Sequence, residues 1–371
     1  MTIKELAHSA HQHIQVISGT PFKRTHVYEL FGAAFGYASY AAFGFEAAFT
    51  PPKAPPWDYK IDTPAIYQRC IDLGYTLAVA NQASTDLTAF LASRNICSIR
   101  IQNLVNRLRD ESDYEDEKET QDDATDSFGN HWYEPEYLMS PLLLESLDMA
   151  ANKGVAEAHY ALALIFGRDE YNDDESVGSS YWHDQEQQGR VLTGVEKEWA
   201  DAYVDGLARE KKYETHLREA ARLGNQLALL EMADQFGDPG FFEQTSSKID
   251  VDPAAIAEIA KNMGREDDAR LWLTRAAESG DINAMRELIE DYDTDDLLRC
   301  WTWIYLAELH GTDLTKDDHY AINEDGSRYD WDVGGNAFVA GEDGIDLPTL
   351  PDSEDKAARS AAEALFRRFP S

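Results

Sequence analysis

The nonapeptide AANKGVAEA, residues 150–158, decides the fold of this chain. Two alanines are followed three residues later by Gly154, and four residues after that glycine comes Ala158. The same spacing recurs in AARLGNQLA, residues 220–228, and in AAESGDINA, residues 276–284. A weaker version, with Cys70 and Ile71 in place of the paired alanines, covers residues 70–78. We therefore treat the pattern as an internal repeat.

The pattern has a direct physical interpretation. Paired alanines end one helix where it crosses a neighbour closely, and the glycine takes the left-handed conformation that a Cβ disfavours. The last alanine of each copy opens a second helix and lets it pack closely. Each copy therefore predicts a helix–turn–helix unit. The positions that define it are Ala151, Gly154 and Ala158, then Ala221, Gly224 and Ala228, then Ala277, Gly280 and Ala284.

These units resemble Sel1-like repeats, which are relatives of tetratricopeptide repeats. The resemblance covers residues 138–312 and implies an all-α fold in which helical hairpins stack into an α-solenoid. The copies start 70 and 56 residues apart, at Ala150, Ala220 and Ala276, so the predicted solenoid is irregular. An additional helix pair is expected over Asp252–Leu273, with Asp252 as N-cap and Pro253 in the first turn.

The rest of the chain divides by composition. Pro51–Pro56 marks a linker, Pro64–Gln82 and Leu87–Leu108 are expected to be helices, and so is Leu297–Leu309. A short hairpin around Asn336–Gly344 is one interpretation of the glycine-rich part near the C-terminus. We predict five regions: a helical N-terminal region over 1–110, with degenerate repeats as an option; an acidic loop over 111–136; the repeat array over 137–312; a long structured loop rich in Gly and Asp over 313–354; and a capping helix over 355–371.

The segment Val27–Phe49 is rich in Ala, Gly, Phe and Tyr, with an uncharged run between Glu29 and Glu46. That run is shorter than the roughly 20 residues that span a bilayer, and it lacks Leu, Ile and Val except at Leu30. A buried helix or a tight helix pair is the preferred interpretation, and a membrane segment is the alternative. The first residues show no basic region followed by an apolar core, so no secretory signal is expected.

Charge is the most unusual bulk property of the chain. It has 69 acidic and 33 basic residues, for a formal net charge of −36. Such a chain repels nucleic acids and anionic membranes and attracts basic protein surfaces. Solubility alone is the competing explanation. We therefore expect a basic protein partner, no nucleic acid and no membrane.

Enzyme motifs are missing from the sequence. It has no phosphate-binding loop, nucleophile elbow, HExxH motif or CxxC pair, and its three cysteines suit a reducing cytoplasm. His8, His11 and His13 suit a metal less well than they suit a soft tail. Asp291–Asp295 opens like a calcium loop but has Asp296 at the glycine position. We expect no catalytic residue, cofactor or metal.

Two groups of residues are candidates for partner binding. Glu111, Asp113, Glu115 and Asp116 belong to an acidic run that either docks a basic partner or is simply a solvated loop. Trp182 and Trp303 are the aromatic candidates, because interfaces use buried aromatic anchors. Core packing is the ordinary alternative for both tryptophans.

The resemblance and the charge together suggest a function. Sel1-like proteins act by binding other proteins, so we expect a cytoplasmic, non-enzymatic protein, and specifically an immunity protein that neutralises a nuclease-type bacterial toxin through an acidic surface. A general adaptor or scaffold in a secretion or signalling assembly is the alternative. A metal-dependent hydrolase built on an acidic cluster is a third, weaker hypothesis. The oligomeric state stays open.

Overall fold

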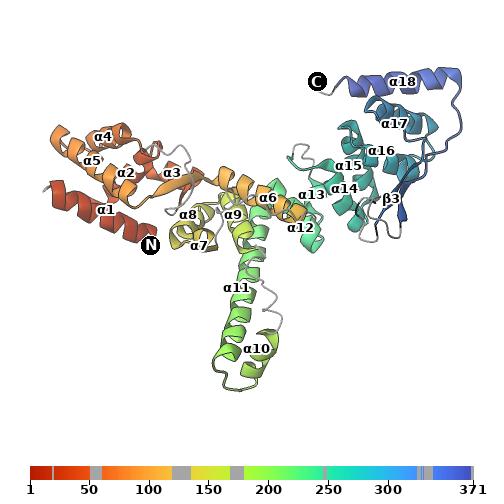
Figure 1. Ribbon diagram of the computed structural model, residues 1–371. Helices are drawn as coiled ribbons and strands as arrows, with labels where there is room; N and C mark the ends of the chain where they lie inside the picture. The colour runs from red at the N-terminus through yellow and green to blue at the C-terminus, as the bar shows by residue number, and fades with distance from the viewer. Residues whose placement is uncertain are drawn as a thin grey trace. The chain divides into compact units, whose positions relative to one another are not determined.

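The chain is mostly helical in the computed structural model, as expected, with two small antiparallel sheets (Figure 1). It forms two compact units, Met1–Met232 and Ala233–Ser371, which are described separately. The residues described are 1–18, 21–50, 61–118, 135–167, 179–244, 249–323, 327, 329 and 337–368, with the backbone alone at 17–18, 110–118, 135–136 and 179. The expected linker Pro51–Pro56 lies outside them.

The first unit begins with a helical layer around an aromatic core. Phe31, Phe43 and Phe49 are fully buried and their rings contact one another edge-on or tilted. Cys70 and Leu87 extend this core into the next hairpin. Its helices are α1 (Ile3–Ser18), α2 (Arg24–Ala34), α3 (Tyr40–Glu46), α4 (Thr63–Asp72) and α5 (Leu77–Ser93).

The segment Val27–Phe49 contains a tight helix pair, α2 and α3, and its last three residues, 47–49, are extended. A Cβ placed on Gly32 would lie 2.8 Å from the backbone of Ser39 and Tyr40, where α3 begins, so only glycine permits this approach. This confirms the preferred interpretation of the segment. Within the described part of the chain, no helix has both the length and the apolar content that crossing a bilayer requires.

Two expected helices are divided in the structure. Pro64–Gln82 is α4 and the start of α5, separated by a turn at Gly74, whose φ is 87°. Leu87–Leu108 contains the end of α5, a strand β2 (Cys97–Arg100) and the start of α6 (Ile101–Lys118). The strand pairs antiparallel with β1 (Ala47–Thr50), which is buried along its whole length. The expectation of one continuous helix was therefore wrong, because a strand of four residues is too short for its alternation to stand out between two helical patterns.

The remainder of the first unit contains the first repeat copy and a longer hairpin. Both ends of the acidic loop expected over 111–136 are helical, because α6 continues to Lys118 and α7 covers Pro135–Leu138. Residues 119–134 lie outside those described. The helices that follow are α8 (Pro141–Ala151), α9 (Ala156–Phe166), α10 (Ser179–Gln187), α11 (Val195–Arg222) and α12 (Gln226–Phe236), the last of which continues into the second unit.

The second unit is a series of short helices followed by a hairpin and a last helix. As predicted, Asp252 caps α14 through a bond from the Ala254 amide at 3.0 Å, and α17 covers Leu297–Leu309. Its elements are α13 (Gly240–Glu243), α14 (Pro253–Asn262), α15 (Glu266–Glu278), α16 (Ile282–Glu287), the π-helical turn η3 (Leu288–Tyr292), α17, β3 (Asp318–Ile322), β4 (Phe338–Glu342) and α18 (Asp352–Phe366).

The region expected as a structured loop over 313–354 contains an antiparallel hairpin. Strand β4 falls inside the predicted Asn336–Gly344, but its partner β3 lies earlier in the chain. The last helix, α18, starts three residues before the expected Asp355 and packs on α17 (Figure 1). Ala358 and Ala362 are its buried positions, so small side chains form this contact.

Candidate functional site

The repeat turns adopt the predicted conformation. Gly154, Gly224 and Gly280 have φ angles of 82°, 89° and 94°, in the left-handed region that favours glycine. Each ends one helix and is followed within a few residues by the next helix. The accompanying alanines are buried at positions 151, 158, 228, 277 and 284, and Ala221 is half-buried. The helix–turn–helix unit is therefore present in all three copies.

The predicted acidic strip is helical at the level of the backbone. Glu111, Asp113, Glu115 and Asp116 lie in the second half of α6, whose first half packs on α9 through residues such as Leu104 and Leu108. Their side chains lie outside the described residues. The structure thus places these positions on a helix that begins in the core of the first unit.

Trp303 has a structural environment. It is 3% exposed, and its indole N–H donates to Oδ2 of Asp293 at 2.9 Å. The Asp293 carboxylate is fully buried and also meets Arg270 Nη2 at 2.6 Å and Arg299 Nε at 2.8 Å. A buried carboxylate held by two guanidinium groups and an indole fixes α15, η3 and α17 together. Trp303 therefore offers no free ring surface to a partner, which corrects its assignment as a partner-binding residue.

The same contacts explain the calcium-like run. Both oxygens of Asp293 are occupied by protein donors, and Tyr292 donates to Glu266 at 2.9 Å. Asp296 caps α17 by accepting the amide of Arg299 at 3.0 Å. These acids complete helix ends and packing contacts. Among the described residues, no group of three or more His, Cys, Asp or Glu side chains is arranged to hold a metal ion.

The sequence predicted that the N-terminal histidines belong to a soft tail. That prediction was wrong, because all three lie on α1. His11 Nε2 lies 2.6 Å from the carbonyl oxygen of Phe22, and His13 packs on Phe90 with ring centroids 5.4 Å apart. His8 and His11 are three residues apart and share one side of the helix, whereas His13 lies on another side. Two of them thus support packing within the first unit.

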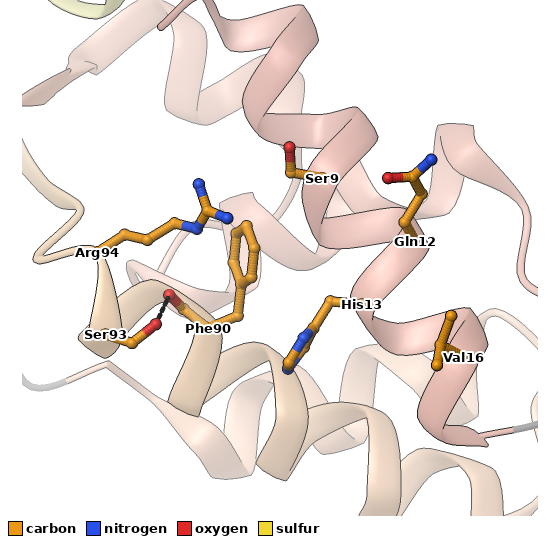
Figure 2. Close-up of a pocket in the computed structure, with 7 residues that line it drawn as sticks. All are labelled: Ser9, Gln12, His13, Val16, Phe90, Ser93 and Arg94. Carbon is orange, nitrogen blue, oxygen red and sulfur yellow. Dashed lines mark hydrogen bonds between the residues drawn. The ribbon is translucent and has the colours of Figure 1, made fainter.

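Figure 2 shows a shallow pocket of about 430 Å³ between α1 and the end of α5. The Arg94 guanidinium lies 4.5 Å from the centroid of the Phe90 ring, and the Ser93 hydroxyl donates to the Phe90 carbonyl at 2.9 Å. Arg94 would attract an anion, whereas the C-terminal ends of α1 and α5 carry partial negative charge that opposes one. These opposing charges give the pocket no defined ligand class. Its lining residues are Ser9, Gln12, His13, Val16, Phe90, Ser93 and Arg94.

The second tryptophan candidate, Trp182, lies on the hairpin formed by α10 and α11. It is half-buried, Arg190 lies over its ring at 4.7 Å from the centroid, and Tyr181 contacts it edge-on at 5.1 Å. The N-terminal half of α11, with α10 beside it, extends beyond the rest of the first unit (Figure 1). Trp182 is therefore placed on an accessible hairpin, and Trp303 is not.

This hairpin also carries residues that the sequence interpretation missed. One side of α11 presents exposed apolar, acidic and small residues together, and we call it the outer face of α11. It was missed because α11 itself was not predicted to begin so early. The signal was the helical spacing of its members: Val195, Glu198, Trp199, Ala202, Asp205 and Gly206.

Two histidines join α9 to α11. The Nδ1 atoms of His159 and His216 lie 3.0 Å apart, so one proton is shared between them. Burial lowers the pKa of each histidine. The charge of His159 and of Lys212 lowers the pKa of His216 further, while Asp148 on α8 opposes this. For His159 the main opposing charge is Glu219. The pair favours the neutral state and acts as a clamp between helices.

Burial disfavours the thiolate form of all three cysteines. Burial raises the pKa of Cys70 to about 12 and that of Cys300 to about 11, and it also raises the pKa of Cys97. The Cys300 thiol donates to the Asp293 carbonyl at 3.0 Å. Because the thiolate is the nucleophilic form, these side chains behave as small packing groups.

Comparison with known proteins gave no match: no family model matches the chain, and neither a curated protein nor a solved structure is similar to it.

Proposed function

We propose that the chain is a non-enzymatic, Sel1-like repeat protein that binds another protein, with its helical hairpins stacked as an irregular α-solenoid. Three copies of one nonapeptide pattern, each with a left-handed glycine between two helices, support this proposal. Repeats of this kind present several helix ends and helix faces to a partner, because each unit contacts mainly its neighbours.

Within this class we propose a cytoplasmic immunity protein that neutralises a nuclease-type bacterial toxin. The observation that carries this is the net charge of −36 on a helical scaffold. A nuclease holds a basic cleft for its polyanionic substrate, and an acidic protein surface can occupy that cleft by presenting similar charge. The exposed apolar residues on α11 would add apolar contacts with the toxin, which a nucleic-acid substrate does not make.

The test is recovery of the partner from the native host. The full chain would be tagged, captured at low and at high salt, and its partners identified by mass spectrometry. One dominant basic partner, released by salt and inhibited by the chain in a nuclease assay, supports the immunity function. A spread of neutral or acidic partners would contradict it and favour an adaptor or scaffold in a secretion or signalling assembly.

The acidic strip offers a second test of the same proposal. Replacing Glu111, Asp113, Glu115 and Asp116 by the corresponding amides removes four charges and keeps side-chain size. Weaker partner binding would assign this part of α6 to the interface. Unchanged affinity would return the strip to a solvated role, while the immunity function would be decided by the nuclease assay.

A further inference from the structure

The outer face of α11 is accessible along three turns of helix. Residues 195, 198, 199, 202, 205 and 206 share one side because they follow helical spacing. The short helix α10 covers a different side, where Ala200 is buried and Tyr203 contacts His183 with ring centroids 5.5 Å apart. The core of the first unit is reached only further along α11, at Leu217 and Ala220. Among the described residues of this unit, the outer face is therefore unpartnered.

Apolar side chains on this face are exposed. Val195 is 53% exposed and Trp199, one turn later, is 36% exposed. Leaving such side chains in water forfeits the roughly 1.5–3 kcal/mol that full burial of a large apolar side chain contributes. Tryptophan is also enriched among the residues that dominate binding energy at protein interfaces. A partner that covers this side would recover that free energy.

Small residues continue the face. Gly206 lies in the interior of α11, where glycine costs about 1 kcal/mol relative to alanine. A Cβ at Gly206 would meet no atom within 4 Å, so packing within the described chain does not require glycine there. Gly206 is half-buried, and Ala202, one turn earlier, is exposed. Together they let the backbone of another segment approach α11 closely.

Charge selects the kind of partner. Glu198 and Asp205 are exposed on the outer face. The basic residues nearby are already engaged: Lys197 pairs with Glu186 and Asp201 at 2.7 and 2.8 Å, and Arg190 pairs with Glu196 at 3.0 Å. Arg209, one turn after Asp205, also has a partner. The face therefore keeps a negative potential. A second copy of the chain would bring like charges together, whereas a basic segment would be attracted.

We propose that the outer face of α11 docks a basic amphipathic helix of a partner protein, with Trp199 as the apolar anchor and Gly206 as the point of closest approach. This rests on the proposed protein-binding function and names the surface that performs it. The basic side chains of the partner helix would pair with Glu198 and Asp205, and its apolar residues would cover Val195 and Trp199.

The experiment uses the full chain and a synthetic amphipathic helix of leucine and lysine, about 18 residues or five turns long. Binding is measured by calorimetry for the native chain and for three variants. We expect Trp199→Ala to weaken binding about tenfold. Gly206→Ala should raise the melting temperature, because alanine favours the helix more than glycine does. The same variant should weaken binding, because its Cβ occupies the space where the partner helix comes closest to α11. Val204→Ala, at a 42% exposed position on another side of α11, is the control and should stay within about twofold.

Equal affinities for all four proteins would mean that the peptide binds diffusely to acidic surface, and would overturn the proposal. So would a dimer of the free chain, seen by sedimentation, that Trp199→Ala dissociates, since the occupant would then be a second copy. If a basic host partner bound the Trp199→Ala variant with unchanged affinity, the outer face of α11 would not be its docking surface. The proposed function would still stand. Absence of any basic host partner would remove the immunity function, while a localised peptide site would still stand.

Discussion

At the scale of single residues, Asp293 is the side chain on which the second unit depends most. Its carboxylate is fully buried between Arg270, Arg299 and Trp303. We expect Asp293→Asn to lower the free energy of unfolding by about 2–3 kcal/mol, because two charge-assisted bonds are lost. The figure lies below that for a fully buried pair, since both arginines remain partly exposed to water.

Urea denaturation followed by tryptophan fluorescence measures this effect. The matched control is Asp295→Asn, two residues along the same turn and exposed, which should change the unfolding free energy by less than about 0.5 kcal/mol. If both variants behaved alike, the carboxylate of Asp293 would not have the structural role assigned to it.

Glycines at two kinds of position should respond oppositely to alanine. Gly154 has a φ of 82° and open space where a Cβ would go, so Gly154→Ala costs backbone strain of about 1–2 kcal/mol without any clash. Gly206→Ala should stabilise the chain by up to about 1 kcal/mol, because residue 206 is already helical. Melting curves of the two variants would shift in opposite directions. A stabilised Gly154→Ala would contradict the left-handed turn at the centre of the repeat.

At the scale of elements, the sequence predicted the turns better than the strands. The turns at Gly154, Gly224 and Gly280 were predictable, because a helix that ends in a residue with positive φ usually has glycine at that position. Strand β2 was not, because Cys97–Arg100 has only four residues, too few for its alternation to stand out between two helical patterns. The outer face of α11 was missed for a related reason: its members become a face only when the helix is known to begin at Val195.

The candidate site residues divide in the same way. Trp182 and Trp303 look alike in the sequence, yet one lies on an accessible hairpin and the other is buried between Asp293 and Arg299. Burial of a tryptophan depends on tertiary contacts, such as the hydrogen bond of Trp303 to Asp293, which lies 10 residues earlier on the other side of a turn. Residue type alone therefore could not distinguish a tryptophan that is accessible to a partner from one that is buried in the core.

The contact between α9 and α11 should depend on pH. His159 and His216 both have a lowered pKa, so the unfolded chain binds protons more tightly than the folded chain does. Between their lowered pKa and the ordinary value near 6.5, the free energy of unfolding should therefore fall as the pH falls. Below the folded-state pKa this loss is complete.

Denaturation of the full chain between pH 7.5 and 5.5 measures the effect. The variant His216→Gln keeps a polar side chain on α11 without a titrating group, and its unfolding free energy should depend less steeply on pH over this range. The control His8→Gln changes an exposed histidine at the other side of the unit and should leave the slope as it is. Equal slopes in all three proteins would exclude the clamp as the cause.

At the scale of the whole molecule, net charge sets a balance between the stability of the chain and that of its complex. An excess of 36 negative charges repels itself in the folded state, and salt screens this repulsion over a Debye length of about 10 Å at 0.1 M. Salt also weakens the exposed ion pairs of α11 and α18, each worth at most about 1 kcal/mol. Because each exposed pair contributes little and the excess charge is large, repulsion should dominate.

We therefore expect the urea midpoint of the free chain to rise between about 0.02 and 0.5 M sodium chloride, where the Debye length shortens severalfold. Tetramethylammonium chloride at the same ionic strength separates screening from binding of sodium ions, and should raise the midpoint equally. A midpoint that fell with salt would mean that local ion pairs outweigh the net repulsion. The complex with a basic partner should respond in the opposite direction, since the same screening removes the attraction that forms it. Salt should thus stabilise the chain while it dissociates the complex, and a solubility role for the charge predicts only the first of these effects.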